Sequence, residues 1–309
     1  MLENIARLRS NIESIYMGEP DAIDRVITCL LAAGHLLIED VPGVGKTVLA
    51  SAVAKSIDCS FSRVQLTPDM LPADVLGVTI FDRATDRFEF KKGPIFANIV
   101  LADEINRTTP RTQSAMLEAM SEASVSVDGV VQPLDQPFMV IATQNPYEFE
   151  GTYLLPENQL DRFLMRIELG YPSAEAESEL LDVRPAQTRL TDLAPVLTRE
   201  QAMELRRQTE SVTIRDRVRA YIVRLAQATR DADEIEVGIS PRGSLALAQT
   251  ARATALMDGR DYCTPDDVFA NIAPVCAHRI ITREHGLGGS WRAAAEILDN
   301  IVRTVPSPD

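Results

Sequence analysis

The spacing of apolar residues along the chain changes once, near residue 170. Before that point, short apolar runs alternate with segments whose apolar residues recur at helical spacing. The runs that indicate strands span residues 36–38, 61–66, 98–102, 138–143 and 164–169. After that point, every periodic segment has helical spacing. We therefore predict an α/β domain over residues 1–170, with a parallel sheet flanked by helices, followed by a small all-α lid domain over residues 171–309.

Helix starts and tight turns divide these two domains further. Two helices are expected before the first strand, at residues 1–17 and 21–33, with a short hinge at residues 16–19. Later helices are expected to open at Thr109-Pro110, Thr198, Ser240-Pro241 and Thr264-Pro265, with others at residues 156–163 and 291–302. Hairpins are expected at residues 78–90 and 124–134, the second around the turn Asp128-Gly129.

Residues 40–47, Asp-Val-Pro-Gly-Val-Gly-Lys-Thr, lie between the first predicted strand and an amphipathic helical segment. There the glycine turn can aim backbone N–H groups at a phosphate, and the helix N-terminus adds partial positive charge. Lys46 would reach the terminal phosphates, and the Thr47 hydroxyl would bind Mg²⁺. The alternative is an ordinary glycine-rich turn, which the flanking strand and helix disfavour. The residues expected to contact the nucleotide are Asp40, Pro42, Gly43, Val44, Gly45, Lys46, Thr47 and Val48, with Met17 and Gly18 from the hinge.

One position of this loop departs from the general pattern G-x-x-x-x-G-K-[ST], which has glycine where this chain has Asp40. A carboxylate beside bound phosphates is unexpected, because the two charges have the same sign. The side chain could face away from the phosphates, but the sequence does not show its direction.

Two acidic residues, Asp103 and Glu104, end the strand predicted at residues 98–102. Parallel strands deliver their C-terminal ends to one edge of the sheet, so both acids are expected beside the phosphate loop. Asp103 would hold Mg²⁺ through its water shell, and Glu104 would act as general base on the attacking water. The alternative is a strand with a solvated end. Asn145, after the strand at residues 138–143, could bind the γ-phosphate or the water, although Asn before Pro is also an ordinary turn signal.

Composition and charge narrow the class of protein and partner. The chain has 309 residues, of which 45% are hydrophobic, and no apolar run approaches the roughly 18 residues of a membrane span. The N-terminus has neither a basic region nor an apolar signal core. Four cysteines and three histidines lie far apart without a metal or disulfide spacing, so we expect reduced cysteines in a cytoplasmic protein. The net charge of −14 disfavours nucleic-acid binding and favours a protein partner.

The combined motifs resemble the AAA+ ATPases, and finer strings resemble the MoxR family within them. These strings are Gly-His-Leu-Leu-Ile-Glu-Asp-Val-Pro-Gly-Val-Gly-Lys-Thr at residues 34–47, Leu-Ala-Asp-Glu-Ile-Asn-Arg at 101–107, Gln-Leu-Asp-Arg-Phe at 159–163 and Ser-Pro-Arg at 240–242. The resemblance covers nearly the whole chain, and Asp40 lies within a string typical of this family.

The resemblance implies a homo-oligomeric ring, usually a hexamer, with ATP bound between neighbouring subunits. Arg162 matches the arginine finger that faces the next subunit's γ-phosphate, Arg242 matches the second sensor in the lid, and Asn145 matches the first sensor. Without the resemblance, each arginine could equally be a surface ion pair. The two predicted hairpins resemble elements that lie toward the pore or substrate side of related rings.

The function expected from the resemblance is Mg²⁺-dependent ATP hydrolysis that drives remodelling or assembly of another protein. In this family the partner is commonly a protein with a von Willebrand factor A domain, and the role is chaperone-like. Two alternatives remain: a nucleic-acid motor, which the net charge disfavours, and a nucleotide-gated scaffold with negligible turnover. The scaffold would require the loss of a catalytic residue, yet Asp103, Glu104, Arg162 and Arg242 are all present.

Overall fold

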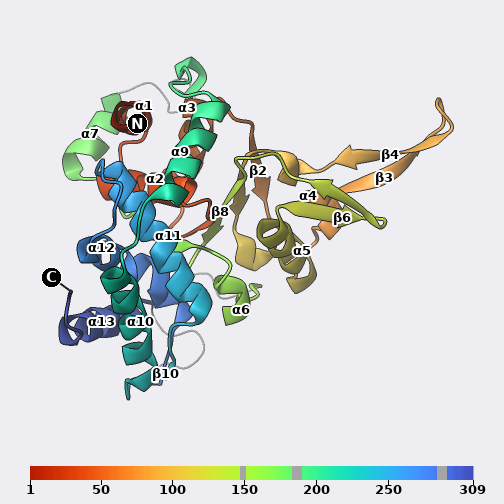
Figure 1. Ribbon diagram of the computed structural model, residues 1–309. Coiled ribbons are helices and arrows are strands. Elements are labelled where there is room, and N and C mark those ends of the chain that lie inside the picture. Colours follow the sequence, from red (N-terminus) through yellow and green to blue (C-terminus); the bar gives the residue numbers. More distant parts are fainter. Residues whose placement is uncertain (147–150, 183–189, 284–290, 309) are drawn as a thin grey trace.

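The N-terminal part of the computed structural model is built on a five-stranded parallel sheet with strand order β2-β5-β8-β1-β9 (Figure 1). The structure describes residues 1–146, 151–182, 190–283 and 291–308. The strands are β1 (Leu36–Glu39), β2 (Phe61–Gln65), β5 (Ile99–Asp103), β8 (Met139–Gln144) and β9 (Met165–Ile167). Each lies within two residues of its predicted run, and the order requires a crossover connection after every strand.

Both faces of the sheet are covered, which explains why its central strands are apolar at every position. Leu36 and Ile38 face a core that α1, α2 and α3 share with the C-terminal helices, whereas Leu37 faces a second core lined by α5. The helices of this part are α1 (Leu2–Glu13), α2 (Pro20–Leu31), α3 (Lys46–Ser56), α4 (Pro72–Leu76), α5 (Pro110–Glu122) and α6 (Glu157–Leu160), with the 3₁₀ turns η1 (Pro94–Phe96) and η2 (Ile105–Arg107). Successive residues of a strand point to opposite faces, so burial on both faces yields a continuous apolar run.

The two predicted hairpins are present. They consist of β3 (Gly77–Asp82) with β4 (Arg87–Lys92), and β6 (Ser124–Val127) with β7 (Val130–Pro133). Asp128 and Gly129 both have positive φ, at 52° and 77°, as the two central residues of a type I′ turn require. The β3–β4 hairpin projects well beyond the rest of the molecule (Figure 1).

The C-terminal part is mainly helical, as predicted, but it also contains a small sheet. Its helices are α7 (Ala174–Asp182), α9 (Arg199–Ser211), α10 (Asp216–Asp231), α11 (Pro241–Met257), α12 (Pro265–Cys276) and α13 (Trp291–Thr304), with the 3₁₀ turn η3 (Ala277–Arg279). Strands β10 (Ile235–Val237) and β11 (Ile281–Thr282) pair antiparallel, and this two-stranded sheet was not predicted from the sequence. Strands of two and three residues are too short to show an alternating pattern, and their pairing joins distant parts of the chain.

The helix starts follow local side-chain chemistry. Thr198 and Gln201 form the predicted capping box of α9, and the Ser240 hydroxyl accepts a hydrogen bond from the N–H of Gly243 at the start of α11. All four cysteines are free thiols, and three of them are buried. His285 lies outside the described residues. A search of the described helices finds none with the length and apolarity needed to cross a bilayer.

Candidate nucleotide site

The loop after β1 adopts the backbone conformation of an anion-binding turn. Gly43 and Gly45 both have φ of +92°, a conformation that favours glycine, and α3 begins directly afterwards at Lys46. The first N–H groups of an α-helix have no partner within the helix. A Cβ added to Gly43 would have no neighbour within 4 Å, so glycine is needed there for its φ rather than for space. The loop can therefore present consecutive N–H donors and the positive end of α3 to a phosphate.

Lys46 lies beside the acidic residues of the neighbouring strands. Its Nζ donates a hydrogen bond to the backbone oxygen of Asp40 at 2.7 Å. Partial burial lowers the pKa of Lys46, and the nearby negative charges of Asp40, Asp103 and Glu104 oppose that shift. The loop lysine and the two acids at the end of β5 therefore belong to one electrostatic site.

The carboxylate of Asp40 holds backbone groups at the end of β9. Its Oδ2 accepts hydrogen bonds from the N–H groups of Leu169 at 2.7 Å and Gly170 at 2.8 Å. Its Oδ1 accepts one from Val41 at 2.7 Å. This is why a carboxylate is found where the general loop pattern has glycine: the negative charge is satisfied by three N–H donors. Of the residue predicted to contact nucleotide, the carboxylate is thus occupied by backbone donors, and the backbone oxygen accepts the hydrogen bond from Lys46.

The end of β5 is fixed by a hydroxyl from β8. Thr143, which is buried, donates to Asp103 Oδ1 at 2.6 Å and accepts from the N–H of Glu104 at 2.9 Å. Asp103 Oδ2 also accepts from Arg63 of β2, at 2.6 Å from Nη2. Glu104 has φ of +58°, an uncommon value for a residue with a side chain. Backbone strain of this kind is concentrated at functional sites, and here it turns the second acid out of the strand direction.

The Glu104 carboxylate is held by two neighbouring side chains. Gln65 Nε2 donates to Glu104 Oε2 at 2.8 Å, and Arg107 Nη1 donates to the same oxygen at 3.1 Å. Gln65 is brought there by the parallel register that places it opposite Asp103. Both donors reach Oε2, which leaves Oε1 as the carboxylate oxygen that can face a water and accept its proton.

The hinge after α1 lies against the phosphate loop. The Tyr16 ring is buried, and its Cε2 would lie 3.2 Å from a Cβ added to Gly45. A Cβ added to Gly18 would overlap Tyr16, so glycine is required there. Burial raises the pKa of Tyr16 to about 12, and the charges of Asp40 and Glu19 add to this shift. Met17 and Gly18 therefore stand next to the loop, where the sequence predicted nucleotide contacts.

Asn145 follows directly after β8, whose last residue Gln144 lies opposite Glu39 at the end of β1. The parallel register therefore brings Asn145 to the same sheet edge as Asp40 and Asp103. This is the position that the sequence indicated for a residue near the γ-phosphate.

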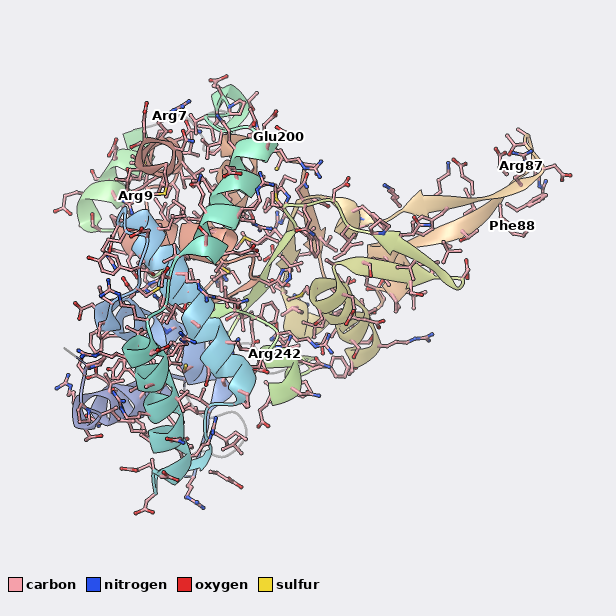
Figure 2. All side chains as sticks on the ribbon, viewed as in Figure 1. Arg7, Arg9, Arg87, Phe88, Glu200 and Arg242 are labelled. Carbon is pink, nitrogen blue, oxygen red and sulfur yellow. The ribbon has the colours of Figure 1, made fainter. Side chains whose placement is uncertain are left out.

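Arg162 and Arg242 lie on either side of the segment around Asp161: Arg162 follows Asp161 in the chain and binds α5, and Arg242 faces the Asp161 carboxylate. Arg162 donates from Nη1 to the backbone oxygen of Leu117 at 2.7 Å and to Ser121 Oγ at 2.9 Å, both on α5. Arg242, at the start of α11, lies 3.8 Å from Asp161 Oδ2 and is half exposed, beside α6 (Figure 2). In the part of the chain that the structure describes, neither arginine forms a hydrogen bond or ion pair with residues 40–47.

The donor set at the sheet edge fits a metal–nucleotide complex. Mg²⁺ takes oxygen ligands, keeps several waters and is usually bound through one or two protein groups together with substrate phosphates. Thr47 and Asp103 supply that small set. Among the described residues there is no cluster of three or more His, Cys, Asp or Glu side chains that could hold a metal ion unaided.

Three residues at the site were missed from the sequence: Thr143, Arg63 and Gln65. Thr143 is the last buried residue of an apolar strand, and a polar residue there was a usable signal. Arg63 and Gln65 flank the buried Val64 on β2, so their alternation placed both on one face. Only the register between β2 and β5 shows that this face reaches the two acids.

Family models match both parts of the chain. Residues 35–165 match the ATPase family associated with various cellular activities (AAA), and residues 227–301 match the AAA lid domain. The first match contains four strands of the sheet with the phosphate loop and ends at the start of β9, and the second contains the end of α10, all of α11 and α12, and most of α13.

Several named proteins are similar to the chain along nearly its whole length. Chaperone MoxR1 of Mycobacterium tuberculosis is 37% identical over 99% of this chain and 83% of that protein. The uncharacterised protein YeaC of Bacillus subtilis is 50% identical over 96% of this chain and 93% of that protein. The crystal structure of a candidate ATPase from Cytophaga hutchinsonii superposes with a TM-score of 0.89 and 35% identity, covering 100% of this chain and 96% of the other.

Proposed function

Because the chain belongs to the MoxR family of AAA+ ATPases, we propose that it couples Mg²⁺-dependent ATP hydrolysis to the remodelling or assembly of a partner protein. The observation that carries this proposal is the meeting of three elements at one sheet edge. The loop before α3 supplies phosphate-binding N–H groups and Lys46, and β5 supplies Asp103 and Glu104. Thr143 of β8 fixes the position of both acids.

Each residue has a distinct task in the proposed reaction. The loop N–H groups and Lys46 would hold the phosphates, and Thr47 and Asp103 would hold Mg²⁺, which would supply positive charge to the phosphate oxygens. Glu104 would accept a proton from the attacking water at Oε1, while Gln65 and Arg107 hold its other oxygen, Oε2. Asn145 orients that water or the γ-phosphate. The Asp40 carboxylate keeps the loop attached to the end of β9.

The site is proposed to be completed by a neighbouring subunit in a hexameric ring. Arg162 would serve as the finger for the next subunit's nucleotide, and Arg242 would reach the phosphates from the lid. A cation placed at the γ-phosphate in the transition state is worth about 10³–10⁵ in rate. Arg162 is held by α5 rather than by its own subunit's phosphate loop, which supports a role at the nucleotide of another subunit.

The proposed client is a protein, with a von Willebrand factor A domain as the first candidate, and the proposed location is the cytoplasm. The net charge of −14 supports a protein over a nucleic acid, because the phosphate backbone would be repelled. The hairpins expose apolar side chains, among them Phe81, Phe88 and Val131. Exposed apolar groups on a projecting element suit contact with another protein.

Affinity capture with the Glu104→Gln variant tests this function. The variant is expected to hold ATP without hydrolysing it, so a client should remain bound during washing with ATP and be released with ADP. The Lys46→Ala variant is the control, since it should bind neither nucleotide nor client. Recovery of nucleic acid instead of a protein, or equal recovery with both variants, would overturn the proposal.

A further inference from the structure

The segment that carries Arg162 is held from the C-terminal part of the chain by one buried arginine. Arg279, in η3 at the end of α12, is only 9% exposed. Its Nε donates to Asp161 Oδ1 at 2.8 Å, and its Nη2 donates to the backbone oxygens of Asp161 at 3.2 Å and Phe163 at 2.7 Å. These hydrogen bonds hold the backbone in place on both sides of Arg162.

All five N–H donors of Arg279 have an acceptor. Nη1 completes the set by donating to the backbone oxygens of Leu164, at 3.1 Å, and of Val275 in α12. A planar guanidinium with five fixed donors sets both the distance and the orientation of its partners. A lysine has three donors on a flexible stem, so it could not hold the same five acceptors in place.

Other contacts connect the same segment to the lid and to α5. His278 lies 3.1 Å from the backbone oxygen of Phe163, and Arg242 faces the second carboxylate oxygen of Asp161. The side chain of Arg162 itself is held by Leu117 and Ser121 of α5. Arg162 therefore lies where α5 and the lid meet, and any displacement of η3 acts on it through its backbone neighbours.

We propose that Arg279 is a positioning residue for Arg162, through which the lid of one subunit sets the geometry of the arginine that serves the nucleotide of the next subunit. This inference rests on the proposed role of Arg162 across the subunit interface. It adds a coupling: the lid of each subunit controls hydrolysis at its neighbour. A displacement of a catalytic group by about 1 Å can cost about 10²-fold in rate, so a modest loosening is sufficient.

A purely structural role for Arg279 predicts something different, and the chain offers a matched control. Arg206 of α9 is also buried, and it links α9 to the backbone oxygen of Leu30 in α2. Within the described residues, its hydrogen bonds go to Leu30 and Gln136 and not to the segment around Arg162. Arg206→Lys therefore removes a comparable buried guanidinium without touching the proposed coupling.

The test measures ATP hydrolysis by rings of Arg279→Lys, Arg206→Lys and wild type, after circular dichroism and size-exclusion chromatography confirm folding and assembly. The expected result is a fall in kcat of about 10- to 100-fold for Arg279→Lys, with KM for ATP unchanged. Arg206→Lys should keep a kcat near wild type. An Arg279→Lys ring with wild-type kcat, or with the loss confined to KM, overturns the proposal.

Mixed rings show which subunit's site depends on Arg279. In a mixture of Arg279→Lys with Glu104→Gln, some interfaces join one subunit of each kind. There the Arg279→Lys subunit supplies an intact Glu104, and the Glu104→Gln subunit supplies Arg162 in a segment still held by Arg279. The rate of ATP hydrolysis by the mixture should therefore exceed the sum of the rates of the two variants measured separately. If Arg279→Lys does not fold, Asp161→Ala replaces it: this change leaves Arg279 its four backbone acceptors, and Arg242→Ala, which removes the other partner of Asp161, is measured beside it.

A parallel mixture of Arg162→Ala with Glu104→Gln separates the two proposals. If activity is restored for Arg162→Ala but not for the Arg279 variant, the role of Arg162 as a finger across the interface is supported and the positioning role of Arg279 is overturned. Failure of both mixtures, with mixed assembly confirmed, would overturn the finger across the interface and the positioning role with it. Rescue of both supports the coupling.

Discussion

Within the phosphate loop, the carboxylate of Asp40 is occupied by the backbone N–H groups of Val41, Leu169 and Gly170. Hydrogen bonds to a charged group contribute more than neutral ones, and an unpaired buried donor is costly. The residue therefore attaches the nucleotide loop to the strand that leads into the lid. Sequence comparison with the general motif could show only that this position is unusual.

Asp40→Asn tests that attachment. The amide NH₂ group would face at least one N–H donor in place of an acceptor, so we expect the free energy of unfolding to fall by about 2–3 kcal/mol. Urea denaturation measures the change. Asp233→Asn, at an exposed position, is the control and should leave stability unchanged. Equal stability of Asp40→Asn and wild type would contradict the assigned role.

Two buried histidines make stability depend on pH. His35 Nδ1 accepts from the N–H of Val140, and its Nε2 faces the backbone oxygen of Met120 at 3.0 Å, so the ring is neutral. Burial lowers the pKa of His35 to about 4, and burial also lowers the pKa of His278. Between pH 6.5 and about 4, the unfolded chain therefore binds more protons than the folded chain.

The free energy of unfolding should accordingly fall as the pH drops below 6.5. Each histidine contributes a slope of up to about 1.4 kcal/mol per pH unit. In His35→Gln, the change in the free energy of unfolding per pH unit between pH 7 and 5.5 should be smaller than in wild type by up to about 1.4 kcal/mol, the contribution of one histidine. Chemical denaturation at several pH values measures both slopes. An unchanged slope in His35→Gln would show that His35 is not held neutral in the folded protein.

At the scale of elements, the β3–β4 hairpin stands apart from the body of the molecule. Phe88 near its tip is 75% exposed and contacts Phe81 edge to face, with 5.3 Å between ring centroids (Figure 2). An isolated aromatic pair of this kind contributes only about 0.5–1.5 kcal/mol. The hairpin therefore exposes apolar surface that folding alone does not require.

Phe88→Ser should leave ATP hydrolysis and the unfolding midpoint close to wild type, because the side chain lies far from the sheet edge. When combined with Glu104→Gln, it should reduce the amount of client captured under ATP. Phe269→Ser, at a half-exposed site on α12, is the matched control and should capture as much client as Glu104→Gln alone. If the Phe88 variant captures as much client as Glu104→Gln alone, the hairpin does not contribute to client binding.

Much of the element order could be predicted from the chain, for reasons visible in particular segments. Strands such as β5 and β8 are buried on both faces and give continuous apolar runs, and Asp128-Gly129 specifies a tight turn. The short helix α4 and the strands β10 and β11 are below the length at which a period is visible. The first helix ends at Glu13, earlier than predicted, because the residues before Gly18 turn back toward the loop.

At the scale of the whole molecule, the predicted site residues form two clusters. Asp103, Glu104 and the phosphate loop meet at one edge of the sheet, as the positions of the strands predicted. Arg242 and Arg279 face the carboxylate of Asp161, Arg279 across 118 positions of the sequence, and Arg162 follows Asp161 in the chain. A motif can identify each member, but only the folded chain shows that the lid holds the segment around Arg162.

The proposed hydrolysis depends most directly on Glu104 as the base that activates water. We would measure ATP binding and steady-state hydrolysis for wild type and Glu104→Gln, with Lys46→Ala as the variant that should not bind. We expect unchanged ATP affinity for Glu104→Gln and a fall in kcat of about 10²–10⁴-fold. Hydrolysis by Glu104→Gln at the wild-type rate would contradict it.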